Sequence, residues 1–160
     1  MSAALFGELR SVVHPEWIDD NGHLNMGYYV VVFDQATDAW LAHIGLGPAD
    51  RARMEVTTFT LESHVCYLRE VLEGAPLRFT TRLLGFDEKR IHYVHEMHHT
   101  GQGYVAATNE LMSLHVSAAT RRAAPMAREV LARLGEVMRR HEALPVPPQV
   151  GRRIGLDARP

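Results

Sequence analysis

Residues 25–45 read NMGYYVVVFDQATDAWLAHIG, and this stretch decides the fold. Asn25 is a candidate helix N-cap, because its side chain can accept hydrogen bonds from free first-turn amides, and Gly45 supplies the C-cap. Between them, apolar side chains recur at helical spacing: Tyr29, Phe33, Ala36, Trp40 and Ile44. The first two turns are apolar almost all round, so we expect a long helix that is buried on most sides.

After a Gly-Pro loop at 47–48, polar and apolar residues alternate with period two. This pattern predicts long strands joined by tight tips, which is typical of an antiparallel meander: 57–67, 77–83, 91–99 and 104–116. Residues 9–14 predict a short first strand. Pro125 opens a second helix with an apolar stripe made by Met126, Val130, Leu134, Val137 and Met138.

This order of elements predicts an α+β hotdog fold, in which a long central helix is wrapped by an antiparallel sheet. One sheet rarely covers such a helix alone, so we expect a homodimer or a dimer of dimers, that is, a homotetramer. We expect one domain over residues 1–145. Residues 146–160 form a tail that contains Pro and Arg and either wraps the surface or frays.

Composition excludes several classes of function. The 160 residues fit one domain, and a net charge of -2 gives no electrostatic footprint for nucleic acid or an anionic membrane. Cys66 is the single cysteine, so nothing indicates secretion. No signal peptide is evident, and the longest apolar run, 26–33, is too short to span a bilayer. We therefore expect a cytoplasmic protein.

Ten histidines raise the question of a metal site. On the predicted strand 91–99, one face carries His92, Glu96 and His98, and the other carries His95 and His99. Their spacing matches no zinc signature, so we expect neither a metal nor a cofactor.

Residues 19–25, DDNGHLN, place a carboxylate in a turn just before a buried helix begins. Free amides and the helix dipole at that end can stabilise a developing oxyanion. A carboxylate beside them can act as a nucleophile or as a general base on water. The segment therefore predicts a site for attack on a carbonyl group.

The pattern Asp-x-x-Gly-His-x-Asn, with Tyr29 four residues after the Asn, resembles the 4-hydroxybenzoyl-CoA thioesterase branch of hotdog proteins. The resemblance implies that Asp19 is catalytic and that a backbone N–H near Met26, just after Asn25, is the oxyanion donor. Met26 stands where the family often has a second Asn, and Trp17 where many members have an Asp. Both departures indicate a reshaped acyl pocket.

Four longer stretches resemble betainyl-CoA thioesterases of carnitine breakdown and the thioesterase-like domain fused to some carnitine dehydrogenases: PEWIDDNGHLNMGYYVVVFDQATDAW, ESHVCYLREV, LLGFDEKRIHYVHEMHH and ATNELMSLHV. Asp20 stands where that group has Tyr. The resemblance implies hydrolysis of betainyl-CoA to betaine and CoA. Aromatic faces and a carboxylate can bind its trimethylammonium, and our candidates are Trp17, His23, Tyr28, Tyr29, Glu62 and His64.

Each candidate also has a plainer interpretation. Aromatics at helical spacing are usually packing, which we favour for Trp40 and leave open for the tyrosines. His23 is either a base or a structural histidine bonded to backbone. Glu62 and His64 share one strand face, which is either solvated or functional. Three cations could meet CoA phosphates or be ordinary surface charge: Arg69, Lys89 and Arg90.

The leading hypothesis is hydrolysis of a small acyl-CoA, with Asp19 attacking the carbonyl or activating water. One alternative is a non-catalytic module that binds acyl-CoA or betaine. Another is a thioesterase for a different short or aromatic acyl-CoA. A hotdog dehydratase or hydratase relies on a His/Glu arrangement to which we find no match.

Overall fold

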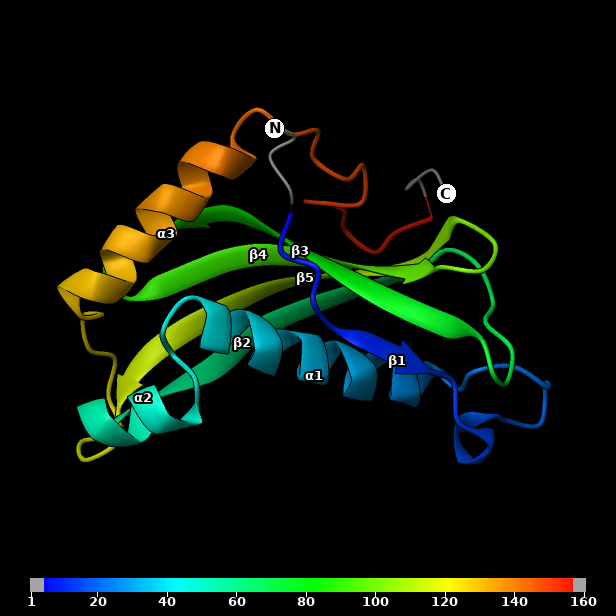
Figure 1. The fold of residues 1–160 in the computed structure, drawn as a ribbon, viewed down its shortest axis with the longest axis horizontal. Coiled ribbons are helices and arrows are strands. Elements are labelled where there is room, and N and C mark those ends of the chain that lie inside the picture. The colour runs from blue at the N-terminus through cyan, green and yellow to red at the C-terminus, as the bar shows by residue number, and fades with distance from the viewer. Residues whose placement is uncertain (1–4, 157–160) are drawn as a thin grey trace.

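The computed structural model describes residues 5–156, which form a curled five-stranded antiparallel sheet with a long helix across one face (Figure 1). The sheet order is β1-β3-β4-β5-β2. The strands are β1 (Arg10–Val12), β2 (Val56–Tyr67), β3 (Pro76–Phe86), β4 (Arg90–His99) and β5 (Tyr104–Ser117). The helices are α1 (Met26–His43), α2 (Pro48–Met54) and α3 (Arg128–His141), with a 3-10 turn η1 (Pro15–Trp17). The predicted α+β hotdog fold is confirmed.

Both predicted ends of the long helix are confirmed. Asn25 Oδ1 accepts a hydrogen bond of 2.9 Å from the amide of Gly27, so Asn25 caps α1. Gly45 follows the last helical turn with a φ of 85°, in the left-handed region that glycine adopts without steric cost.

The expectation that α1 is buried on most sides is wrong for a single chain. The sheet covers one side of the helix, where Val32, Phe33 and Trp40 are fully buried. On the opposite side, Val30 and Val31 keep 43% and 47% of their surface exposed. One curled sheet cannot enclose a helix, so an apolar patch on the first two turns of α1, made by Met26, Val30 and Val31, stays uncovered.

The helix near the C-terminus starts later than predicted. It begins at Arg128 and not at Pro125, because residues 125–127 run extended along the β3–β4 tip. There the amide of Met126 donates to Glu88 O at 2.8 Å. The expected apolar stripe is nonetheless confirmed, since Val130 and Leu134 are buried.

The short helix α2 was not predicted, because Gly47-Pro48 was interpreted as a loop. Pro48 in fact occupies the first turn of α2, a position that tolerates its missing N–H. The helix ends at Glu55, which has a φ of 54°.

The C-terminal segment crosses the outer face of the sheet. Arg82 donates from Nη1 to Pro145 O at 3.0 Å, and the amide of Gly151 donates to Glu110 Oε2 at 2.7 Å. His92 Nε2 lies 2.7 Å from the other oxygen of Glu110. Residues 145–151 therefore wrap the surface, one of the two behaviours expected of the tail.

Candidate active site

The Asp19 turn is closed by backbone hydrogen bonds. Ile18 and Leu24 form an isolated antiparallel bridge at its base. Within it, Asp19 N donates to His23 O at 3.1 Å and Gly22 N donates to Asp19 O at 2.9 Å. Gly22 has a φ of 82°, which a side chain rarely tolerates. The sequence DDNGH thus builds a tight turn in a fixed position before α1.

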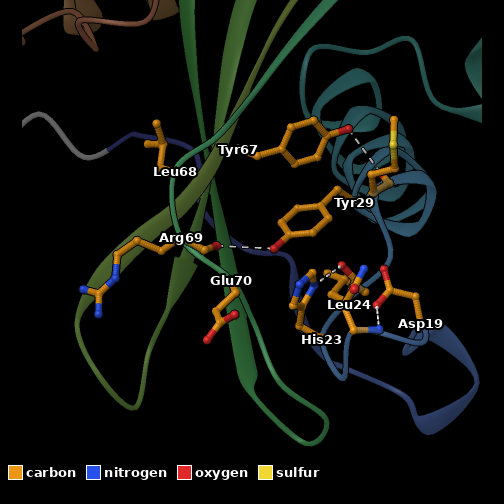
Figure 2. A pocket seen from close by; sticks show the side chains of 10 residues that line it. Asp19, His23, Leu24, Tyr29, Tyr67, Leu68, Arg69 and Glu70 are labelled. Atoms are coloured by element: carbon orange, nitrogen blue, oxygen red, sulfur yellow. Dashed lines mark hydrogen bonds between the residues drawn. The ribbon is translucent and has the colours of Figure 1, made fainter. Parts of the chain in front are cut away.

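Asp19 holds its carboxylate against a cavity of about 410 Å³ (Figure 2). Its Oδ1 accepts from the amide of Asn21 at 2.9 Å, an Asx-type bond that orients the side chain. Within residues 5–156, no hydrogen bond to Oδ2 is found. One carboxylate oxygen is therefore free to face a ligand or water.

The first turn of α1 lies beside this carboxylate. Asn25 occupies two amides, since its Oδ1 accepts from Gly27 and its backbone carbonyl accepts from Tyr28 at 3.0 Å. For Met26 N–H, no acceptor is found in the described part of the chain, and Met26 also lines the cavity. The helix dipole adds positive potential at this end. The geometry suits stabilisation of negative charge on a carbonyl oxygen.

The end of β2 and the connection to β3 form the opposite wall. Tyr67 OH donates to Met26 O at 3.2 Å, and Tyr29 OH donates to Arg69 O at 3.3 Å (Figure 2). Leu24 N donates to Val71 O at 2.8 Å. These three bonds tie the β2–β3 connection to the Asp19 turn and to the start of α1.

Tyr29 is the most strongly perturbed ionisable group that lines the cavity. Burial, and then the neighbouring Tyr104, Tyr67, Glu70 and Asp19, raise the pKa of Tyr29 to about 12. The phenol therefore stays neutral and keeps the proton that it donates to Arg69 O.

The cavity brings together Asp19, His23, Met26, Tyr29 and Arg69 among the predicted site residues. Asn25 sits directly beside them as the helix cap. His23 is partly buried, and its Nδ1 lies 3.4 Å from Leu24 O. This long contact is the backbone partner that a structural histidine would have.

The other predicted residues lie outside this cavity in the single chain. Trp17 and Tyr28 stack on each other with ring centroids 5.7 Å apart. Glu62 and His64 lie on β2, the edge strand. At the β3–β4 tip, Lys89 pairs with Glu88 at 3.3 Å and Arg90 with Asp87 at 2.6 Å.

Five cavity residues were not among the predicted site residues: Asn21 and Leu24 in the Asp19 turn, and three from a separate segment, Tyr67, Leu68 and Glu70. Tyr67 is the last residue of β2, and the other two of that segment follow it. The available signal was an aromatic residue and a carboxylate at the point where the strand alternation ends. The three hydrogen bonds described above, which link this segment to the Asp19 turn and to the start of α1, are tertiary and leave no local pattern in the sequence.

A carboxylate beside the free amide of Met26, at one end of a helix packed on a curled antiparallel sheet, defines a hotdog thioesterase, a hydrolase of thioesters. The chain belongs to the thioesterase-like superfamily, whose sequence profile matches residues 13–134. The resemblance drawn from the sequence is thereby confirmed.

Relatives of known activity agree with this class. The chain is 49% identical over 144 residues to the betainyl-CoA thioesterase of Pseudomonas aeruginosa, and this alignment covers 90% of this chain and 91% of that protein. It is 38% identical over 154 residues to the L-carnitine dehydrogenase/betainyl-CoA thioesterase of Rhizobium meliloti. That match covers 93% of this chain but 30% of the longer protein.

Solved structures agree as well. A Staphylococcus aureus protein in complex with CoA superposes with a TM-score of 0.89 at 27% identity, covering 98% of each chain. A Pseudomonas putida KT2440 protein proposed to be a thioesterase superposes with a TM-score of 0.83 at 35% identity, covering 97% of this chain and 99% of that one.

Residues 5–156 contain neither a metal-binding cluster nor a membrane-spanning helix. No group of three or more His, Cys, Asp or Glu side chains there is arranged to hold a metal ion. Within the same residues, no helix is both long and apolar enough to cross a membrane.

Proposed function

We propose that this protein hydrolyses betainyl-CoA to betaine and CoA, with Asp19 as the catalytic carboxylate. The observation that carries the proposal is the position of Asp19. It lies on a cavity wall beside the first-turn amides of α1, in a chain 49% identical to a betainyl-CoA thioesterase. We expect no cofactor beyond the CoA that the substrate brings.

If Asp19 is a general base, it accepts a proton from a water molecule whose oxygen attacks the thioester carbonyl carbon. The oxyanion that forms lies within reach of Met26 N–H. As this intermediate collapses, the C–S bond breaks. The thiolate of CoA then takes up the proton from Asp19, and the carboxylic acid that forms releases its own proton to solvent and leaves as betaine.

If Asp19 is a nucleophile, its carboxylate attacks the same carbon and displaces the thiolate of CoA. Water then hydrolyses the mixed anhydride and restores Asp19. A single-turnover experiment in ¹⁸O-labelled water separates the two routes. Trapping of an acyl-enzyme, or label in the Asp19 carboxylate, indicates the nucleophile. Absence of any trapped acyl-enzyme indicates the base; label is read only when it is found in Asp19, because water that attacks the acyl carbon of the anhydride labels betaine instead.

We propose that the protein works as a homodimer or homotetramer. Two exposed apolar surfaces suit contact with a second copy: the patch on the first two turns of α1, and the outer residues of the edge strand β2, such as Leu61 with 51% of its surface exposed. A second copy would also bring Glu62 and His64 toward the site. We expect the enzyme in the cytoplasm.

We keep the three predicted cations as candidates for the CoA phosphates. Arg69 is at the cavity, with its guanidinium carbon 3.8 Å from the ring centroid of Tyr104. Lys89 and Arg90 would have to exchange their carboxylate partners for phosphate.

The test is thiol release from betainyl-CoA, acetyl-CoA, a medium-chain acyl-CoA and 4-hydroxybenzoyl-CoA. We expect betainyl-CoA to give the highest kcat/KM. Preference for another thioester would overturn the substrate and leave the class. No release from any thioester, combined with measurable binding, would favour the non-catalytic module.

A further inference from the structure

We propose that Tyr67 and Glu70, at the end of β2 and just beyond it, form the subsite that recognises the positive charge of the acyl group. The inference rests on the proposed function and deepens it. It assigns the choice between a quaternary ammonium and a neutral acyl group of the same shape to two residues that the sequence interpretation did not select.

The chemistry of the substrate limits where this subsite can be. In betainyl-CoA, a single methylene separates the quaternary nitrogen from the thioester carbonyl carbon. When the carbonyl lies between Asp19 and Met26 N–H, the nitrogen has to lie in the same cavity. The stacked pair Trp17 and Tyr28 does not line that cavity, whereas Tyr67 does.

The aromatic part of the subsite is a corner made by two tyrosines. The rings of Tyr29 and Tyr67 meet at 89° with centroids 5.1 Å apart. Both hydroxyls are held by backbone carbonyls, of Arg69 and Met26 respectively, so the rings are fixed before substrate arrives (Figure 2). A trimethylammonium cannot donate a classical N–H hydrogen bond, and it binds best against the faces of aromatic rings.

The charge around this corner is negative. Asp19 and Glu70 both line the cavity, and the negative charge of each helps to raise the pKa of Tyr29. In the described part of the chain, the Glu70 carboxylate makes no hydrogen bond or ion pair. Its backbone is held, because Glu70 O accepts from Tyr104 OH at 2.8 Å.

Arg69, the arginine that lines the cavity, does not neutralise this charge at the rings. Arg69 lies between Tyr67 and Glu70 in sequence, but its side chain extends away from Tyr29 (Figure 2) and its guanidinium rests over Tyr104. Glu70 lines the same cavity as Tyr29 and Tyr67, and an unpaired carboxylate together with aromatic rings is complementary to a cation that offers no donor.

The experiment compares betainyl-CoA with 3,3-dimethylbutanoyl-CoA, in which carbon replaces the quaternary nitrogen and the charge is lost. The quantity measured is the ratio of the two kcat/KM values. We expect Glu70→Gln to lower this ratio about fivefold, the size of a partly exposed charge pair. Glu73→Gln is the matched control, since Glu73 lies on the same connection but does not line the cavity, and it should leave the ratio unchanged.

Tyr67 is tested by a pair of variants. Tyr67→Leu removes the ring and should lower the ratio about tenfold, whereas Tyr67→Phe keeps the ring and should retain most of it. A merely structural role would instead lower both kcat/KM values together and leave the ratio intact.

An unchanged ratio in both Glu70→Gln and Tyr67→Leu would overturn the subsite. Failure of the wild-type protein to hydrolyse either thioester would contradict the proposed function and not this inference. In that case, calorimetric binding of the two thioesters to the same variants gives the ratio, and again an unchanged ratio overturns the subsite.

Discussion

The two ends of α1 lie on the same sheet but differ in packing: the C-terminal half is closed by a packed core, whereas the first turn borders an open cavity. Around the C-terminal half, α3 closes the space, so that Trp40, Tyr93 and Leu134 have no exposed surface. Around the first turn, no helix within residues 5–156 covers the helix–sheet edge, and a cavity remains beside Asp19. The helix and the sheet are common to both ends, and the difference is that α3 covers only one of them.

The forces holding the two ends differ accordingly. The closed end depends on apolar burial, which contributes about 1.5–3 kcal/mol per large side chain. The open end depends on hydrogen bonds such as those of Tyr67 and Tyr29 to backbone carbonyls, each of which contributes about 1 kcal/mol net. Substitutions at the open end should therefore change activity, and those at the closed end stability.

The largest expected effect is loss of turnover at the open end. Asp19→Asn should lower kcat by about 10²–10⁴-fold, because an amide can neither accept the proton of water nor attack the carbonyl well. Asparagine can still accept the hydrogen bond from Asn21 N, so the free energy of unfolding should change by less than about 0.5 kcal/mol. Thiol release and urea unfolding measure the two quantities.

The neighbouring residue is the matched control. Asp20 is exposed and does not line the cavity, so Asp20→Asn should retain kcat. Full activity of Asp19→Asn, or equal loss in both variants, would remove Asp19 as the catalytic group.

The second prediction reverses the pattern at the closed end. Leu134 is fully buried among α1 and sheet residues, so Leu134→Ala should cost about 3 kcal/mol of unfolding free energy through lost burial and a cavity. In the folded protein kcat should be retained. Leu131, which is only partly buried against the same cluster, should cost less when replaced by Ala. An equal cost at both positions would contradict the view that α3 closes this end by packing.

The closed end was predictable from the sequence, because periodicity reports burial. The spacing of Phe33 and Trp40 in α1, and of Val130 and Leu134 in α3, identified both packed faces. The predicted start of α3 at Pro125 was wrong. Residues 125–127 are kept extended by a tertiary hydrogen bond between Met126 and Glu88, which no local pattern reveals.

The open end was predictable only in part. Asp19 and Asn25 carry a local turn-and-cap pattern, and the structure puts them beside each other at the start of α1. Tyr67 and Glu70 come from a segment more than 40 positions further along the chain. No period or cap relates them to the Asp19 turn, and Trp17 and Tyr28 were favoured because they lie near it in sequence.

The third prediction concerns His95, which lies beneath the middle of α1. It is fully buried between hydroxyls of Thr37 at 3.0 Å and Thr81 at 2.8 Å, and burial lowers the pKa of His95 from 6.5 to about 3. Below pH 6.5 the unfolded chain therefore binds a proton that the folded chain does not. As the pH decreases below 6.5, the free energy of unfolding should decrease by up to about 1.4 kcal/mol per pH unit until the pKa of the folded state is reached.

Urea unfolding between pH about 7 and about 5 measures this slope. His95→Gln removes the titration, so its slope should be shallower than that of the wild-type protein. Some slope should remain from His141 at the closed end, whose pKa is lowered to about 4 by burial and then by Arg82, His43 and Arg140. Equal slopes in the two proteins would show that His95 is not the source.

The smallest effect belongs to Asn25, the one residue at the open end that stabilises the helix and borders the chemistry. Asn25→Ala removes the cap of α1 and should cost about 1 kcal/mol of unfolding free energy, whereas Asn25→Ser should retain most of it. The cap also fixes the first-turn amides beside Asp19, so kcat should fall in Asn25→Ala and be largely restored in Asn25→Ser. A loss of stability with unchanged kcat would mean that the Asn25 cap stabilises the fold without affecting the reaction. Asp19 would then be the group at the open end on which catalysis depends.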